Sequence, residues 1–150
     1  MAKKKAAGSP LELFLSHSSR DRKFAAKLAA MLRQQGIPVW YSSTHILGAR
    51  QWHDEIGKAL ARCDWFAIVL SPDSVRSKWV KRELLYVLND NRYENRIVPI
   101  RYKDCKESAL SWILPSIQAV DFTKNYEVGC QALLQIWRLP KRKPLTKGSL

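Results

Sequence analysis

The chain has 150 residues, of which 46% are hydrophobic and 26% charged, and its formal net charge is +13. This length suits one domain with a single core, and the composition excludes a disordered or membrane-embedded chain. No apolar run reaches the roughly 18 residues that span a bilayer, and the basic N-terminus lacks the apolar segment of a secretory signal. Three widely spaced cysteines, Cys63, Cys105 and Cys130, fit free thiols. We therefore expect a cytoplasmic protein without membrane contact.

The positive charge is concentrated at the two ends of the chain. Residues 6–140 hold 19 of the 26 basic residues and all 13 acidic ones, a net charge of +6. We expect residues 1–10 to be a disordered basic lead-in, 11–139 to be the domain, and 140–150 to be a basic tail or the start of a linker. These ends are either solvated or in weak contact with a polyanion. The other bases are scattered and no nucleic-acid motif is present, so we expect no specific nucleic-acid partner.

Short apolar segments with strand character alternate with segments of helical periodicity along the chain. The expected strands cover 11–16, 37–41, 65–70, 96–101 and 117–122. Helices are expected after Ser18 or Ser19 as far as Gly36, then over about 50–62, 74–88 and 126–139. Pro99 inside the fourth strand indicates an edge position or a bulge. Residues 103–115 are read as irregular, with one helical turn around 109–113. In the last helix, the residues expected on the buried side are Val128, Leu133, Ile136 and Trp137.

The alternation of strands and helices predicts a single α/β domain. We expect a flavodoxin-like three-layer fold, in which a five-stranded parallel sheet of order 2-1-3-4-5 carries helices on both faces. The continuous apolar run of the third strand suits a sheet that is covered on both sides. In this strand order, ligands bind at the carboxyl ends of the first and third strands. In this chain those ends are residues 16–19 and 71–77.

The helix after the third strand carries a large aromatic residue and a carboxylate on one face. Ser77 is a candidate N-cap, and Trp79 and Glu83 are four residues apart. Such a pair suits a flat, cationic ligand that bears hydroxyl groups. In the alternative reading, Trp79 only covers the sheet edge and Glu83 pairs in solvent with Arg82 or Lys81. The topological rule and this local pattern point to the same place, which favours a site.

Other kinds of site find little support in the sequence. No Gly-x-Gly-x-x-Gly follows the first strand, which argues against a dehydrogenase site. The histidines His17, His45 and His53 lack the spacing of metal ligands, so no metal is expected. Cys63 falls on the buried stripe of its helix, where core packing is more plausible than nucleophilic catalysis.

Several motifs in order resemble a TIR domain of the kind widespread in bacteria, over roughly residues 11–137. The matching segments are Phe14-Leu15-Ser16-His17, Gly36-Ile37-Pro38-Val39-Trp40-Tyr41, Ile46-Leu47-Gly48 with Trp52, and Ile68-Val69-Leu70-Ser71 followed by Ser77-Lys78-Trp79 and Glu83-Leu84. The last segment resembles the family's Ser-x-Trp-x-x-x-Glu signature. Bacterial relatives often carry Asp after the second strand, where this chain has Ser42-Ser43.

This resemblance implies an NAD+ nucleosidase that acts in bacterial defence or signalling. It implies that Glu83 is the catalytic residue, that NAD+ is the substrate, and that no cofactor is needed. The implied substrate-binding residues are His17, Ser18, Ser19, Trp52, Ser77 and Trp79. The products are nicotinamide and either ADP-ribose or a cyclic ADP-ribose isomer.

The expected chemistry suits a single carboxylate. Nicotinamide in NAD+ is already cationic and leaves as a neutral molecule without a general acid. The transition state resembles an oxocarbenium ion, which Glu83 can stabilise electrostatically. Either Trp79 or Trp52 can stack on the pyridinium ring through cation–π attraction.

A second reading is a non-catalytic module that acts through TIR–TIR interaction or as an adaptor. The loop 42–48 contains two adjacent aliphatic residues, Ile46 and Leu47, followed by Gly48. These side chains either pack back onto their own sheet or dock on a neighbouring TIR domain, as the family's loop does. We therefore expect the partners to be NAD+ and other TIR domains.

Overall fold

The structure, a computed structural model, describes residues 8–42 and 49–139, without the side chains of 49–51. Five strands form one sheet of order β2-β1-β3-β4-β5, and every neighbouring pair is parallel. The strands are β1 (Leu13–Ser16), β2 (Val39–Trp40), β3 (Trp65–Leu70), β4 (Ile97–Arg101) and β5 (Val120–Asp121). The predicted fold class and strand order are confirmed.

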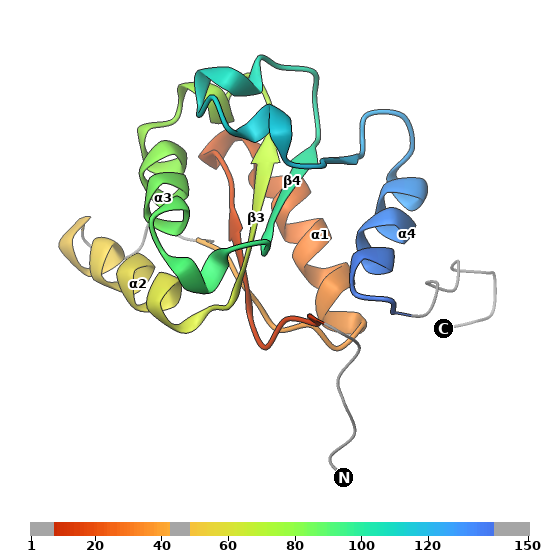
Figure 1. The fold of residues 1–150 in the computed structure, drawn as a ribbon, viewed down its shortest axis with the longest axis horizontal. Helices are drawn as coiled ribbons and strands as arrows, with labels where there is room; N and C mark the ends of the chain where they lie inside the picture. The colour runs from red at the N-terminus through yellow and green to blue at the C-terminus, as the bar shows by residue number, and fades with distance from the viewer. Residues whose placement is uncertain (1–7, 43–48, 140–150) are drawn as a thin grey trace, which may run out of the picture.

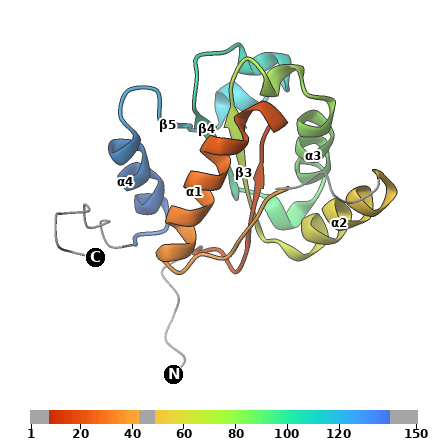
Figure 2. The same ribbon diagram turned by 180° about the vertical axis from the view of Figure 1, so that it is seen from behind.

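Helices cover both faces of the sheet, and the sheet divides the core into two parts (Figures 1 and 2). The helices are α1 (Arg22–Gln34), α2 (Ala49–Arg62), α3 (Lys78–Leu88) and α4 (Tyr126–Ile136). Trp65, Ala67 and Val69 of β3 pack with α1 and α4, whereas its alternate residues pack with α2 and α3. All six β3 residues are buried, as the apolar run predicts. No helix in the described part of the chain is long and apolar enough to cross a membrane.

The expectation of an edge position or a bulge at Pro99 is wrong, because β4 lies between β3 and β5 and pairs with β3 without a break in register. Pro99 pairs in register with Ile68 of β3. Arg96 and Tyr102, which flank β4, bond to β3, so the even-numbered residues of β4 direct their backbone groups toward β3. The Arg101 carbonyl instead accepts from the Phe122 amide, on the side of β5. The nitrogen of Pro99 therefore faces β5, which pairs with β4 only from Ile100 onwards. A missing N–H at Pro99 thus costs no bond in the sheet.

The predicted buried side of the last helix is partly wrong. Val128 is 64% exposed and Ile136 is 39% exposed, whereas Leu133 and Trp137 are buried as expected. The helix approaches the sheet through Gly129, where an added Cβ would lie 2.5 Å from the Phe122 ring. This close approach sets the buried face of α4, and the helix ends at Ile136 instead of residue 139.

The chain ends and the irregular segment also differ in detail from the expectations. β1 begins at Leu13, so Leu11 lies outside it and is exposed, while Pro10 of the expected lead-in is buried. The single turn expected around 109–113 is replaced by two short 3-10 helices, Glu107–Ala109 and Leu114–Ser116.

Candidate active site

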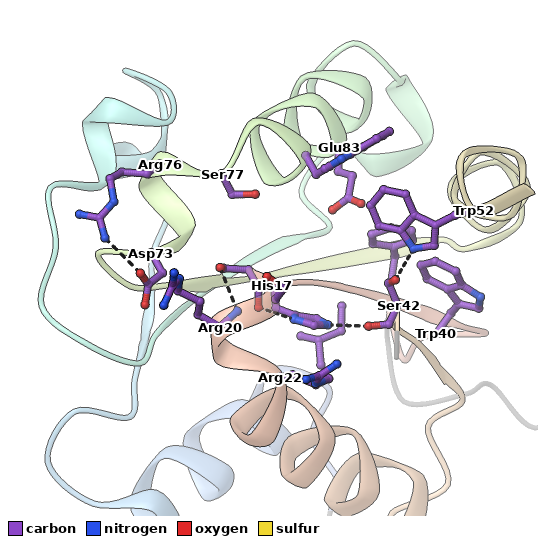
Figure 3. Close-up of a pocket in the computed structure, with 15 residues that line it drawn as sticks. His17, Arg20, Arg22, Trp40, Ser42, Trp52, Asp73, Arg76, Ser77 and Glu83 are labelled. Atoms are coloured by element: carbon purple, nitrogen blue, oxygen red, sulfur yellow. Dashed lines mark hydrogen bonds and ion pairs between the residues drawn. The ribbon is translucent and has the colours of Figure 1, made fainter. Parts of the chain in front are cut away.

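A pocket of about 910 Å³ opens at the carboxyl ends of β1 and β3, where the strand order predicts a ligand (Figure 3). The segments after β1, β2 and β3 line it, together with α2 and α3. The pocket brings together all seven residues proposed from the sequence for catalysis and substrate binding, namely His17, Ser18, Ser19, Trp52, Ser77, Trp79 and Glu83. The expected assembly residues Ile46, Leu47 and Gly48 lie outside the described residues.

Glu83 lies buried at the pocket, on the second turn of α3. The helix begins at Lys78 instead of residue 74, after the short 3-10 helix Ser74–Arg76, and Ser77 is its N-cap as predicted, because Ser77 Oγ accepts from the Val80 amide at 3.2 Å. Glu83 is only 7% exposed, and its Oε1 accepts a hydrogen bond from Ser16 Oγ at 2.6 Å. Burial raises the pKa of Glu83 to about 7, against the lowering effect of this hydrogen bond. The reading of Glu83 as a solvent-exposed partner of Arg82 or Lys81 is therefore wrong.

Aromatic rings form one wall of the pocket. The rings of Trp52 and Trp79 meet edge to face, with centroids 4.4 Å apart, and the Arg82 guanidinium lies over Trp79 at 5.2 Å. Trp52 Nε1 donates to Ser42 Oγ at 2.5 Å. Ser42 thus fixes the orientation of Trp52. Trp40 adds a further ring at the end of β2.

Polar and cationic groups gather where the chain leaves β1. His17 has one ring nitrogen 2.8 Å from the Ser18 carbonyl oxygen and the other 3.1 Å from the Ser42 carbonyl oxygen. Ser18 Oγ accepts from the Arg20 amide at 3.2 Å and so caps the 3-10 turn Ser19–Asp21 that leads into α1. Arg20 and Arg22 line the pocket and are exposed. Within the described residues, neither guanidinium has a hydrogen-bond or ion-pair partner.

A buried hydrogen bond connects the loops that follow β1 and β3. Asp21 accepts from Ser71 Oγ, and burial raises the pKa of Asp21. Ser71 and Ser74 in turn bond to each other through their hydroxyl and backbone groups. These contacts fix the segment that leads into α3, and with it the position of Glu83.

Several pocket residues were not singled out from the sequence. They are Phe14, Leu15, Arg20, Arg22, Trp40, Ser42, Asp73 and Arg76, and Ser16 contacts Glu83 from behind the pocket. Most of them lie in the segments that follow the carboxyl ends of β1, β2 and β3, to which the strand order points. Among residues 8–42 and 49–139, no group of three or more His, Cys, Asp or Glu residues is placed to hold a metal ion.

Comparison with known proteins places the chain in a family. The family model described as TIR domain matches residues 13–134. The chain is 28% identical over 90 residues to a probable 2′ cyclic ADP-D-ribose synthase of Methanobrevibacter olleyae, covering 59% of this chain and 26% of that protein. It is 30% identical over 103 residues to a 2′ cyclic ADP-D-ribose synthase of Acinetobacter baumannii, covering 67% and 38% respectively. The corresponding enzyme of Bacteroides thetaiotaomicron is 28% identical over 101 residues, which cover 66% of this chain and 35% of that protein.

These relatives are longer proteins, and the matches span only 26% to 38% of their length. Among solved structures, the TIR domain of a Toll-related receptor from Hydra magnipapillata superimposes with a TM-score of 0.68 at 19% identity, covering 84% of this chain and 97% of that one. The TIR domains of the activated Roq1 resistosome give 0.63 at 18% identity, covering 83% and 98%. Both likenesses concern the fold alone. By the match of its sequence over residues 13–134, the chain belongs to the TIR domain family.

Proposed function

We propose that this TIR domain cleaves NAD+ at the bond between nicotinamide and ribose, with Glu83 as the catalytic carboxylate. The observation that carries the proposal is the position of Glu83, buried beside a pocket with Ser16 as its hydrogen-bond partner. The names of the three relatives as 2′ cyclic ADP-D-ribose synthases support the same chemistry.

The reaction needs one negative charge at the correct place. The bond between ribose and the nicotinamide nitrogen breaks, its electron pair stays on the ring, and nicotinamide leaves as a neutral molecule. The positive charge that develops on the ribose is stabilised by the Glu83 carboxylate in its low-dielectric surroundings. Water then adds to the ribose and releases a proton, which gives ADP-ribose. When a hydroxyl of the same molecule adds instead, the product is a cyclic isomer.

The rest of the pocket suits the other parts of NAD+. The Trp52–Trp79 pair offers aromatic surface to the cationic nicotinamide ring. Arg20 and Arg22, with Ser18 and Ser19 beside them, offer positive charge and hydroxyl groups to the diphosphate. NAD+ is in this proposal the substrate, and the reaction uses no cofactor.

Self-association belongs to the proposal as a condition for full activity. Its support is the pair Ile46 and Leu47 in a polar loop between β2 and α2. Two adjacent aliphatic side chains there fit a contact with a second TIR domain. A cytoplasmic location and a role in bacterial defence or signalling also remain predictions.

The direct experiment is to incubate the protein at high concentration with NAD+ and to separate the products by chromatography. We expect nicotinamide in equal amount to ADP-ribose or a cyclic isomer. NADH is the matched control, because its nicotinamide ring is not cationic and would have to leave as an anion. A protein that releases no nicotinamide at any concentration would instead be a non-catalytic adaptor.

A further inference from the structure

The two carboxylate oxygens of Glu83 have different surroundings. Oε1 accepts a hydrogen bond from Ser16 Oγ at 2.6 Å. Among residues 8–42 and 49–139, Oε2 has no hydrogen-bond partner. In that part of the chain only Trp65 Nε1 and Trp137 Nε1 are both fully buried and unpaired, so Oε2 is not completely buried. Glu83 lines the pocket, and Figure 3 shows its carboxylate directed into it. Oε2 is therefore the oxygen that a bound ligand can reach.

Ser16 holds its position through the sheet and does not itself line the pocket. It is the last residue of β1, it is 1% exposed, and it lies opposite Ile68 in the central pairing of β1 with β3. Its backbone is therefore fixed, and its side chain donates to a carboxylate on α3 that is 67 residues away in the sequence. A substrate in the pocket would touch Glu83 but not Ser16.

Other charged groups around Glu83 do not replace this contact. The ionisable groups that share the pocket or contact its aromatic wall are His17, Arg20, Arg22, His53, Asp73 and Arg76, and those on the exposed side of α3 are Lys78, Lys81 and Arg82. None of these groups shifts the pKa of Glu83, which burial raises and the Ser16 hydroxyl lowers. Within the part of the chain that the structure describes, Ser16 is thus the one specific stabilising neighbour of ionised Glu83.

We propose that Ser16 is a positioning residue for the reaction: its hydroxyl holds Glu83 Oε1, so that an ionised Oε2 faces the ribose. This inference rests on the proposed function for its catalytic consequence. The physical reason is that a hydrogen bond to the charged form of a buried carboxylate favours ionisation and fixes its rotamer. Ser16 acts only through Glu83, so its loss should change the pH dependence of the reaction as well as its rate.

The test compares pH profiles of kcat for nicotinamide release in the parent, Ser16→Ala and Ser16→Thr. In Ser16→Ala the acid limb should move to higher pH by about one unit, the size expected from a lost hydrogen bond to a charged group. Activity below the limb should fall about tenfold and recover in part when the pH is raised. Ser16→Thr keeps the hydroxyl and should restore the parent's limb. Superimposable limbs in the parent and Ser16→Ala would overturn the proposal.

A second variant keeps the test decisive if Ser16→Ala does not fold. Ser16→Cys has nearly the same volume and a weaker donor, so it should shift the limb by an intermediate amount; an unshifted limb would overturn the proposal. Thr123→Ala is the matched control, because the Thr123 hydroxyl also donates to a carboxylate, Asp121 Oδ1, at 2.6 Å but lies outside the pocket. It should leave the limb where the parent has it. An equal shift in Thr123→Ala would count against a specific role for Ser16.

A measurement without substrate separates this inference from the proposed function. The Glu83 carboxyl carbon is followed by carbon-13 NMR during a pH titration, and its signal is assigned by its loss in Glu83→Gln. Ser16→Ala should move the midpoint upward whether or not the protein cleaves NAD+. An unmoved midpoint overturns the Ser16 inference alone. A moved midpoint in a protein that never releases nicotinamide overturns the proposed function alone.

Discussion

The indole rings of Trp52 and Trp79 meet edge to face in the pocket wall, and Trp52 is held there by its bond to Ser42 Oγ. Because Arg82 already lies over the Trp79 ring, Trp52 is the better candidate for contact with the nicotinamide ring.

Loss of a cation–π contact of about 0.5–2 kcal/mol in Trp52→Ala should raise KM for NAD+ between about twofold and thirtyfold. The KM of Trp52→Phe should lie between those of the parent and Trp52→Ala. Trp112, which is 85% exposed and outside the pocket, provides the control Trp112→Ala. Steady-state kinetics decide, and an unchanged KM in Trp52→Ala would contradict this role.

Arg20 and Arg22 should bind the diphosphate of NAD+, since both line the pocket. Exposed ion pairs contribute about 0.2–1 kcal/mol, so Arg20→Gln and Arg22→Gln should each raise KM by about 1.4- to 5-fold. The difference from the parent should shrink as salt is added. Lys23→Gln removes a neighbouring exposed charge of α1 that does not line the pocket, and it should leave KM unchanged. Equal effects from all three substitutions would show only a general influence of charge.

The buried carboxylate of Glu83 should make stability depend on pH. Burial raises its pKa from the usual 4.5 to about 7 on folding. Between these values the folded state binds more protons than the unfolded state, so the free energy of unfolding falls as pH increases, by about 3 kcal/mol in all. Glu83→Gln removes the charge and should remove this decline, which makes it the more stable protein above pH 7. Urea unfolding from pH 4.5 to 8.5 measures both proteins. Parallel stability curves would contradict the burial of an ionisable Glu83.

The loop residues Ile46 and Leu47 should support assembly of TIR domains. If the loop docks on a neighbour, specific activity rises with protein concentration in the parent. Ile46→Asp combined with Leu47→Asp should remove this rise, because unpaired carboxylates are costly to bury at an interface. Specific activity is measured across a concentration series, together with thermal unfolding. A flat series in the parent contradicts the assembly mechanism, and a variant that unfolds indicates that the two side chains pack onto their own domain.

The fold was predictable because its main determinants are local. The apolar run of β3 and the alternation of strands and helices fix a parallel sheet covered on both faces. The misread details depend on tertiary neighbours. Pro99 is tolerated inside the sheet because β5 begins one residue later, and the buried face of α4 follows from the contact of Gly129 with Phe122. Neither the length of a neighbouring strand nor a helix–ring contact is visible in local periodicity.

The candidate site was predictable in its place but not in its electrostatics. Strand order and the spacing of Trp79 and Glu83 locate the pocket, since both depend on short segments. The burial of Glu83 and its bond to Ser16 depend on how α3 packs on β1. The pattern of the helix alone was also compatible with a solvent-exposed ion pair of Glu83 on the helix surface.

The central claim is that Glu83 drives cleavage of NAD+, and Glu83→Gln tests it most directly. Glu12→Gln is the matched control, because Glu12 pairs with Arg62 at 2.6 Å and lies outside the pocket. Nicotinamide release from NAD+ is measured for the parent and both variants at the same high protein concentration and at pH 8, where Glu83 is ionised. The account predicts release by the parent and by Glu12→Gln, and none above background by a folded Glu83→Gln. Undiminished release by Glu83→Gln would contradict it.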